Sequence, residues 1–144
     1  MPRLRTISLY LQALLYVAAG VNHLWHPASY LGVMPPYFSY PVFWVAFTGY
    51  CEIAGGAGLV IPATRRAAGV GIALMLVGYF TVHLHMLVHH ADLFANIPVL
   101  LLWLRVFFQP VLIWWALKSG GVTGADAARS AVLRPAGFDR SQRL

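Results

Sequence analysis

The chain has 144 residues, of which 60% are hydrophobic and only 10% are charged, and its mean hydropathy is +0.69. A soluble globular domain carries roughly 25% charged residues and about 45–50% apolar ones, so this composition excludes both a soluble domain and a disordered chain. The single cysteine, Cys51, excludes a disulfide scaffold. The net charge of +6 leaves nucleic-acid binding open until the basic residues are located. The composition therefore predicts an integral membrane protein.

Four apolar stretches are long enough to cross a bilayer as helices, which takes about 20 residues each. They cover residues 6–25, 42–61, 67–88 and 97–117, and prolines mark their ends. The sequence thus predicts an all-α fold, a four-helix transmembrane bundle, with residues 1–118 as one transmembrane domain. Residues 119–144 are expected to form a basic, flexible cytoplasmic tail. The N-terminal stretch resembles a signal peptide, but we expect it to be retained as the first helix.

Nine of the ten basic residues flank the same ends of these helices. They are Arg3, Arg5, Arg65, Arg66, Lys118, Arg129, Arg134, Arg140 and Arg143. The loops at the opposite ends contain no Lys or Arg, so the positive-inside rule predicts that both termini are cytoplasmic. We expect a multi-pass protein of a bacterial cytoplasmic membrane whose first partner is the lipid bilayer. The location of the charge excludes a nucleic-acid partner.

Two ionisable residues remain inside the spans, where an unpaired charge costs several kcal/mol. Glu52 lies in the second predicted helix and Arg105 in the fourth, at a similar depth from the outer face. We predict a buried Glu52–Arg105 ion pair, with Gln109 and His83 satisfying the remaining hydrogen bonds. Whether this pair only locks the bundle or belongs to a ligand site stays open at this point.

Small residues surround the carboxylate on its helix, because Gly49, Gly55 and Gly56 share one face with it and permit close helix approach. A binding cavity would need further polar groups. Tyr50, Tyr79 and Thr48 could supply them.

All six histidines lie toward the outer face. His23 and His26 end the first predicted helix, and the other four end the third. We place His23 among the candidate site residues with His83. His85 and His89, one helical turn apart, have a spacing that zinc, copper or haem iron could use. Membrane-edge histidines are more often interface residues, so we expect no resident metal or haem there.

The outer loop after the first predicted helix is rich in tyrosine, phenylalanine and proline. We expect a short interfacial segment there, lying on the bundle within an aromatic belt that includes Trp25 and Trp44.

The order of these features resembles the DoxX-like family of small four-helix membrane proteins, over about residues 8–118. The residues that carry the resemblance are Ala19-Gly20-Val21-Asn22-His23, Thr48-Gly49-Tyr50-Cys51-Glu52, Arg65-Arg66-Ala67-Ala68 and Leu104-Arg105-Val106-Phe107-Phe108-Gln109. The His-Leu-His run in the third predicted helix departs from the family pattern. The resemblance implies an association with membrane redox systems.

Two functions follow as hypotheses. The first is an accessory or quinone-interacting subunit of a membrane redox system, with a polar site that opens to the outer face and binds a quinone as cofactor. The second is a non-enzymatic chaperone, assembly or structural protein in which the Glu–Arg pair only locks the bundle. Other membrane or redox subunits are candidate partners, and a homo-oligomer is left open.

Overall fold

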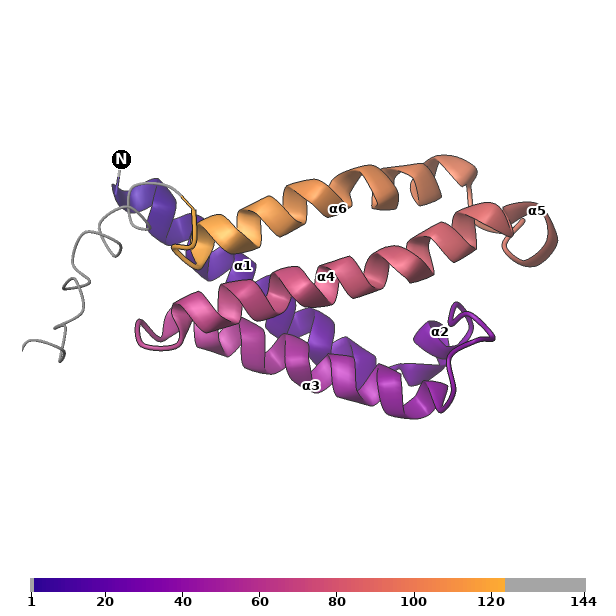
Figure 1. The fold of residues 1–144 in the computed structure, drawn as a ribbon, viewed down its shortest axis with the longest axis horizontal. Coiled ribbons are helices and arrows are strands. Elements are labelled where there is room, and N and C mark those ends of the chain that lie inside the picture. Colours follow the sequence, from indigo (N-terminus) through magenta and orange to yellow (C-terminus); the bar gives the residue numbers. More distant parts are fainter. Residues whose placement is uncertain (1, 124–144) are drawn as a thin grey trace, which may run out of the picture.

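The computed structural model describes residues 2–123, and that part of the chain is helical without strands. Six helices follow one another (Figure 1): α1 (Pro2–Trp25), α2 (Pro27–Leu31), α3 (Pro41–Val60), α4 (Arg65–Val88), α5 (His90–Leu93) and α6 (Val99–Ser119). The tail predicted to be flexible lies outside the described residues, apart from its first few. Four of the described helices are long and apolar enough to cross a membrane, so the chain is a multi-pass membrane protein.

The four long helices coincide with the four predicted spans, with small differences at their ends. The helix α1 begins at Pro2, several residues before the predicted start. The first turn is helical but polar, so a prediction from apolar length did not include it. The helix α6 begins later than predicted because Pro98 is its N-cap. The expected short segment in the outer loop is the helix α2, whereas α5 was not predicted and forms one turn in what we expected to be a loop.

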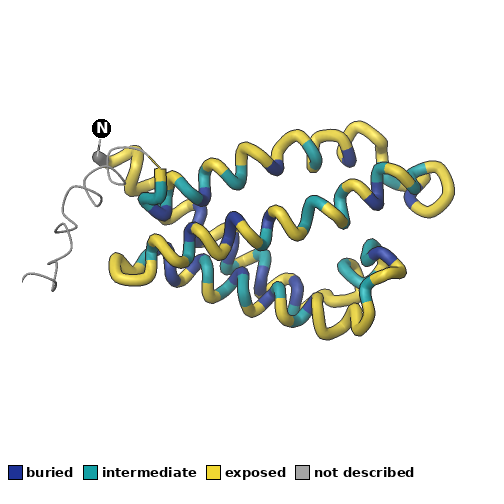
Figure 2. Tube along the Cα trace, in the orientation of Figure 1, coloured by how far each residue is buried: buried dark blue, intermediate teal, exposed yellow. Residues whose placement is uncertain are grey.

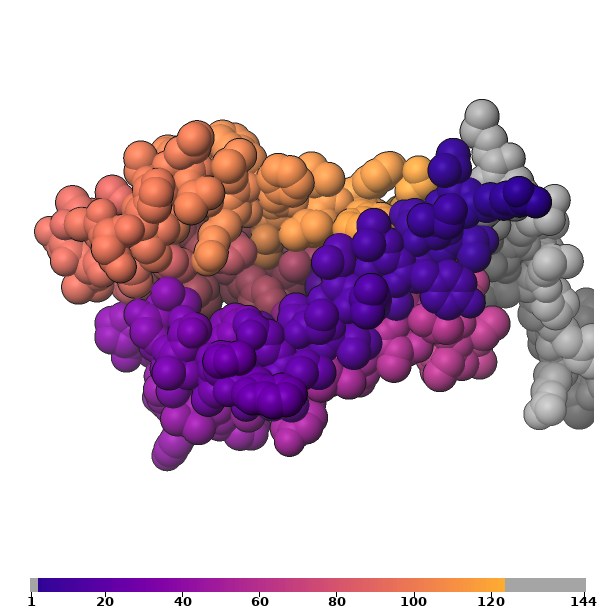
Figure 3. Space-filling view, turned by 180° about the vertical axis from the view of Figure 1, so that it is seen from behind, coloured from indigo at the N-terminus to yellow at the C-terminus, as the bar shows by residue number. Residues whose placement is uncertain are grey.

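The long helices pack as two pairs. The most extensive contacts join α1 to α3 and α4 to α6, and α4 also contacts α3. The two pairs meet where α1 begins and α6 ends, and they diverge toward the end that carries α2 and α5 (Figure 1). Seen from behind, the surface is hollowed between α6 and the C-terminal part of α1, and α4 forms the floor of the hollow (Figure 3).

Glycines set the distance between the paired helices. A Cβ atom on Gly56 of α3 would lie 2.6 Å from the carbonyl oxygen of Ala13 on α1, and a Cβ on Gly20 would clash with the backbone of Gly49. We call the end where the two helix pairs meet the closed end. There, a Cβ on Gly69 of α4 would lie 2.7 Å from the Cα of Gly120. These small residues allow backbones to approach closely, which is a common way to pack helices in lipid.

The buried residues line the inner faces of the helices, and the outer faces are apolar and exposed (Figure 2). Along α1, for example, the side chains of Leu4, Ile7 and Leu14 are each more than 60% exposed. Apolar surface of this extent is stable only against lipid or another protein. The inner faces form one cluster around Leu59, Ile72 and Leu76 and a second around Met86 and Leu102.

Candidate functional site

Glu52 lies on the face of α3 that packs against α1, and its side chain is almost completely buried, with 3% of the residue exposed. Its position follows from its neighbours along the helix. Gly49 is one turn before it and Gly56 one turn after it, and both contact the α1 backbone. The carboxylate is therefore held between two close helix contacts.

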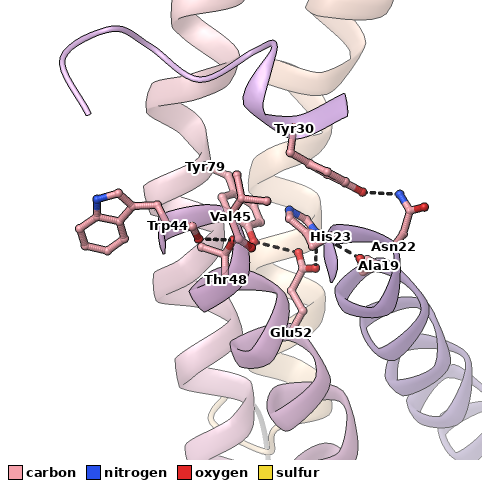
Figure 4. A network of polar contacts seen from close by, with 9 residues as sticks. All are labelled: Ala19, Asn22, His23, Tyr30, Trp44, Val45, Thr48, Glu52 and Tyr79. Atoms are coloured by element: carbon pink, nitrogen blue, oxygen red, sulfur yellow. Dashed lines mark hydrogen bonds and ion pairs between the residues drawn. The ribbon is translucent and has the colours of Figure 1, made fainter. Parts of the chain in front are cut away.

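His23 of α1 is the ionisable partner of this carboxylate. Its Nδ1 atom lies 2.9 Å from Oε2 of Glu52 and 3.0 Å from the carbonyl oxygen of Ala19 (Figure 4). A carbonyl oxygen only accepts hydrogen bonds, so Nδ1 carries the proton. That N–H is aligned with Ala19, and Oε2 receives no aligned donor from the described residues. The arrangement leaves one buried carboxylate oxygen able to accept a further hydrogen bond.

Tyr79 of α4 completes the group by donating its hydroxyl to Oε1 of Glu52 over 2.9 Å (Figure 4). Its ring stacks on that of His23 with centroids 6.2 Å apart. Thr48, one turn before Glu52, donates to the carbonyl oxygens of Trp44 and Val45. The contacts of Glu52 thus join α1, α3 and α4 at one buried point. We call His23, Glu52 and Tyr79 the polar cluster.

The short helix α2 covers the polar cluster near the C-terminal end of α1. The Tyr30 ring stacks on His23 with centroids 3.6 Å apart. Asn22 donates from Nδ2 to the Tyr30 hydroxyl over 2.5 Å, and its Oδ1 lies 3.1 Å from Nδ1 of His26. Tyr30 lies in the outer loop of the sequence and was not among the predicted site residues. In the structure, the stacked ring of Tyr30 holds the imidazole of His23 in place.

The predicted Glu52–Arg105 ion pair is wrong. Arg105 is exposed, and Nη1 of its guanidinium lies 4.0 Å from Sδ of Met86. The physical reason is the order of the helices: α6 packs on α4, whereas Glu52 faces α1 and α4. Equal depth in the membrane places two residues at one level, but it does not make their helices neighbours.

The remaining predicted site residues differ in burial, and none of them is hydrogen-bonded to Glu52. Gln109 is buried, but it donates to the carbonyl oxygen of Leu76 over 2.6 Å and does not reach Glu52. Tyr50 is 64% exposed on the outward face of α3, so it lies outside the polar cluster. His83 lies on the same side of α4 as Tyr79, and its Nδ1 is buried without a hydrogen-bond partner among the described residues.

The rings of His85 and His89 lie 4.3 Å apart, and Nδ1 of His89 is 3.0 Å from the backbone oxygen of His85. Within residues 2–123, no three side chains of His, Cys, Asp or Glu are placed to share a metal ion.

A cleft of about 1160 Å³ lies between α3 and α4 and reaches His23 and Tyr79 of the polar cluster, whereas Glu52 is not among its lining residues. Its polar lining includes His23, Thr48, Tyr79, His83 and Arg105. The rest is mostly apolar, and much of it is small: a Cβ atom on Gly71 or Gly78, both on α4, would meet nothing within 4 Å. The cleft thus combines a long apolar wall with a polar end.

Sequence reasoning missed Gln12 and Tyr16, which continue the buried polar face of α1 away from His23. Gln12 is completely buried, and neither its Oε1 nor its Nε2 has a hydrogen-bond partner among the described residues. Tyr16 is 9% exposed. The signal was present in the spacing, because residues 12, 16, 20 and 23 share one helix face.

The chain belongs to the family described as a domain of unknown function (DUF8561), whose profile matches residues 12–119, from the first half of α1 to the last residue of α6. Neither the search of characterised proteins nor the search of solved structures gave a match.

Proposed function

We propose a function from the geometry, because the description of the family names no activity: the chain binds an amphipathic, quinone-like lipid in the cleft between α3 and α4. The single observation that carries this proposal is the combination in one cleft of an apolar wall with open glycine positions and a polar end at His23, Tyr79 and His83. Ligand pockets are mostly apolar with a few placed polar groups.

The residues present fit such a ligand. The open space over Gly71 and Gly78 suits an apolar chain, and the buried, unpartnered Nδ1 of His83 suits a carbonyl or hydroxyl of a head group. Arg105 lines the same cleft and can donate to a carbonyl oxygen. A bound quinone would supply reversible two-electron chemistry. The chain itself would bind and orient the head group, and Glu52 with His23 could hold a proton beside it.

In biological context, we propose an accessory subunit of a membrane redox system, in line with the resemblance to DoxX-like proteins. Both termini would face the cytoplasm of a bacterial cell, since Lys and Arg concentrate where α1 begins and α6 ends. The polar cluster would then open toward the outer half of the membrane. Other redox subunits remain the partners that this function implies.

A titration tests the ligand. Purified full-length protein in detergent is titrated with a short-chain ubiquinone, and binding is measured by calorimetry. We expect saturable binding that Gly78→Leu weakens about 10- to 100-fold, because overpacking a site costs about 1–3 kcal/mol. Ala18→Leu is the matched control, since Ala18 is exposed and outside the cleft. Equal binding by both variants, or no saturable binding by the wild type, would refute the proposal.

One observation favours the second function, a non-enzymatic assembly or structural protein. The polar cluster joins three helices, so it can lock the bundle without any ligand. This function predicts that variants of the cluster lose stability while the titration with quinone remains flat for the wild type. The two functions are therefore separated by the same titration.

A further inference from the structure

A second cavity, of about 840 Å³, lies at the closed end of the bundle, where α1 begins, α3 joins α4 and α6 ends. Four basic side chains line it: those of Arg5, Arg65, Arg66 and Lys118. None of its described lining residues is acidic. The cations of Arg65, Arg66 and Lys118, from α4 and α6, attract an anion to this cavity, and the attraction is stronger near the low-dielectric membrane than in water.

Two of these basic side chains, those of Arg65 and Lys118, are held by contacts with their neighbours. The guanidinium of Arg65 donates from Nε to the carbonyl oxygen of Leu59 over 2.8 Å and from Nη2 to that of Val60 over 3.2 Å. These carbonyls end α3, so the cation is fixed at the negative end of that helix. Arginine carries five donors, and three remain for another acceptor.

Two tryptophans form the wall from α6. Trp115 donates from Nε1 to Oγ of Ser8 on α1 over 2.8 Å, which ties the two helices together at this level. The Nζ atom of Lys118 lies 4.5 Å above the ring of Trp114, a distance at which a cation and an aromatic face attract each other. Tryptophans are enriched at the depth of lipid head groups.

The cavity continues from these cations onto apolar side chains, since Leu9 and Val111 also line it. An inorganic phosphate would use only the charged part. A phospholipid would place its phosphate among the cations and its glycerol and acyl groups along the apolar part. We propose that this cavity binds the phosphate head group of an anionic phospholipid such as phosphatidylglycerol. The site is separate from the cleft between α3 and α4, and its occupancy does not depend on the proposed quinone.

Native mass spectrometry of the full chain in detergent tests the proposal, with dioleoyl phosphatidylglycerol and dioleoyl phosphatidylcholine as probes. We expect phosphatidylglycerol to bind more tightly. Arg66→Gln with Lys118→Gln should weaken its binding about 30-fold, because one basic residue near an anionic lipid contributes about 1 kcal/mol, or about fivefold in affinity. Both side chains are exposed, and circular dichroism checks that the double variant folds.

The matched control is Arg3→Gln, which removes one exposed charge at the same end but outside the cavity. It should leave binding nearly unchanged, whereas Arg66→Gln alone should weaken it. Equal binding of the two lipids by the wild type, or equal losses in the two single variants, would overturn the proposal. Displacement of the lipid by an equal concentration of glycerol phosphate would assign the cavity to a soluble phosphate and would also overturn it.

Discussion

At the scale of single residues, the packing of α1, α3 and α4 depends on the buried carboxylate of Glu52. Glu52 contacts His23 of α1 and Tyr79 of α4, and it has no solvent to replace either partner. Removing one partner of a buried polar group costs the desolvation of the group left behind. The identities of these residues were predictable, because an ionisable residue inside a span is rare. Their pairing was not, since the sequence does not record which helices are neighbours.

A double-mutant cycle measures the pairing of Glu52 with His23. Glu52→Gln removes the charge, and His23→Phe keeps a ring that can stack on Tyr30. We expect the double variant to be less destabilised than the sum of the single variants, with a coupling of about 1–3 kcal/mol in the free energy of unfolding in detergent.

The matched cycle combines Glu52→Gln with Arg105→Leu. Because these residues are not paired in the structure, their effects should add within about 0.5 kcal/mol. Strong coupling in this second cycle, with additivity in the first, would restore the pairing that the sequence alone suggested.

Tyr79→Phe tests the other contact of the carboxylate. Loss of the hydroxyl leaves Oε1 of Glu52 without its donor, so we expect the free energy of unfolding to fall by about 1–3 kcal/mol. Tyr50→Phe removes the same hydroxyl from an exposed tyrosine on α3 and should change stability by less than about 0.5 kcal/mol. Equal effects of the two substitutions would mean that the bond to Glu52 contributes nothing.

At the scale of helices, the four spans were predictable from apolar length and from proline positions, and the structure places them within a few residues of the expected ends. The interpretation of the small residues as one packing face is correct for Gly49 and Gly56, which face α1, whereas Gly55 faces Ile72 of α4. What the sequence could not supply is the choice of neighbour, because each long helix is apolar over most of its surface and could pack on any of the others. Close approach at Gly49 and Gly56 directs that face of α3 to α1.

Two glycine substitutions separate packing from helix propensity. Gly56→Ala places a Cβ atom 2.6 Å from the backbone oxygen of Ala13, so α1 and α3 must move apart. We expect a loss of about 1–3 kcal/mol in the free energy of unfolding. Gly71→Ala adds the same methyl group where nothing lies within 4 Å.

That second variant should be neutral or more stable by up to about 1 kcal/mol, because alanine favours a helix over glycine. Thermal unfolding in the same detergent compares the two. A neutral Gly56→Ala would show that α1 and α3 are not held at the distance described.

At the scale of the whole molecule, two helix pairs meet at one end and diverge at the other (Figure 1). The closed end carries the basic cavity and the divergent end carries the polar cluster, and the cleft runs along α3 and α4. A polar site that opens to the outer face was a hypothesis from the sequence, but the lining of neither cavity was predictable, because each is formed by residues from several helices whose arrangement depends on tertiary contacts. The charge asymmetry that distinguishes the two ends was visible in the sequence.

The orientation in the membrane follows from this asymmetry. We predict that green fluorescent protein fused after Leu144 is fluorescent and that alkaline phosphatase fused there is inactive, because both report a cytoplasmic C-terminus. An alkaline phosphatase fused within the loop between α2 and α3 should be active. The opposite pattern would place the polar cluster in the inner half of the membrane.

Photolabelling tests most directly whether the cleft between α3 and α4 holds a quinone-like lipid against the polar cluster, as we propose. The full-length protein is illuminated with an azido-quinone, and the labelled peptides are sequenced by mass spectrometry. We predict labels on cleft residues of α3 and α4 around Thr48 and Tyr79, suppressed by excess unlabelled quinone. Labels spread along the lipid-facing surface of α1, and unchanged by the competitor, would contradict the account.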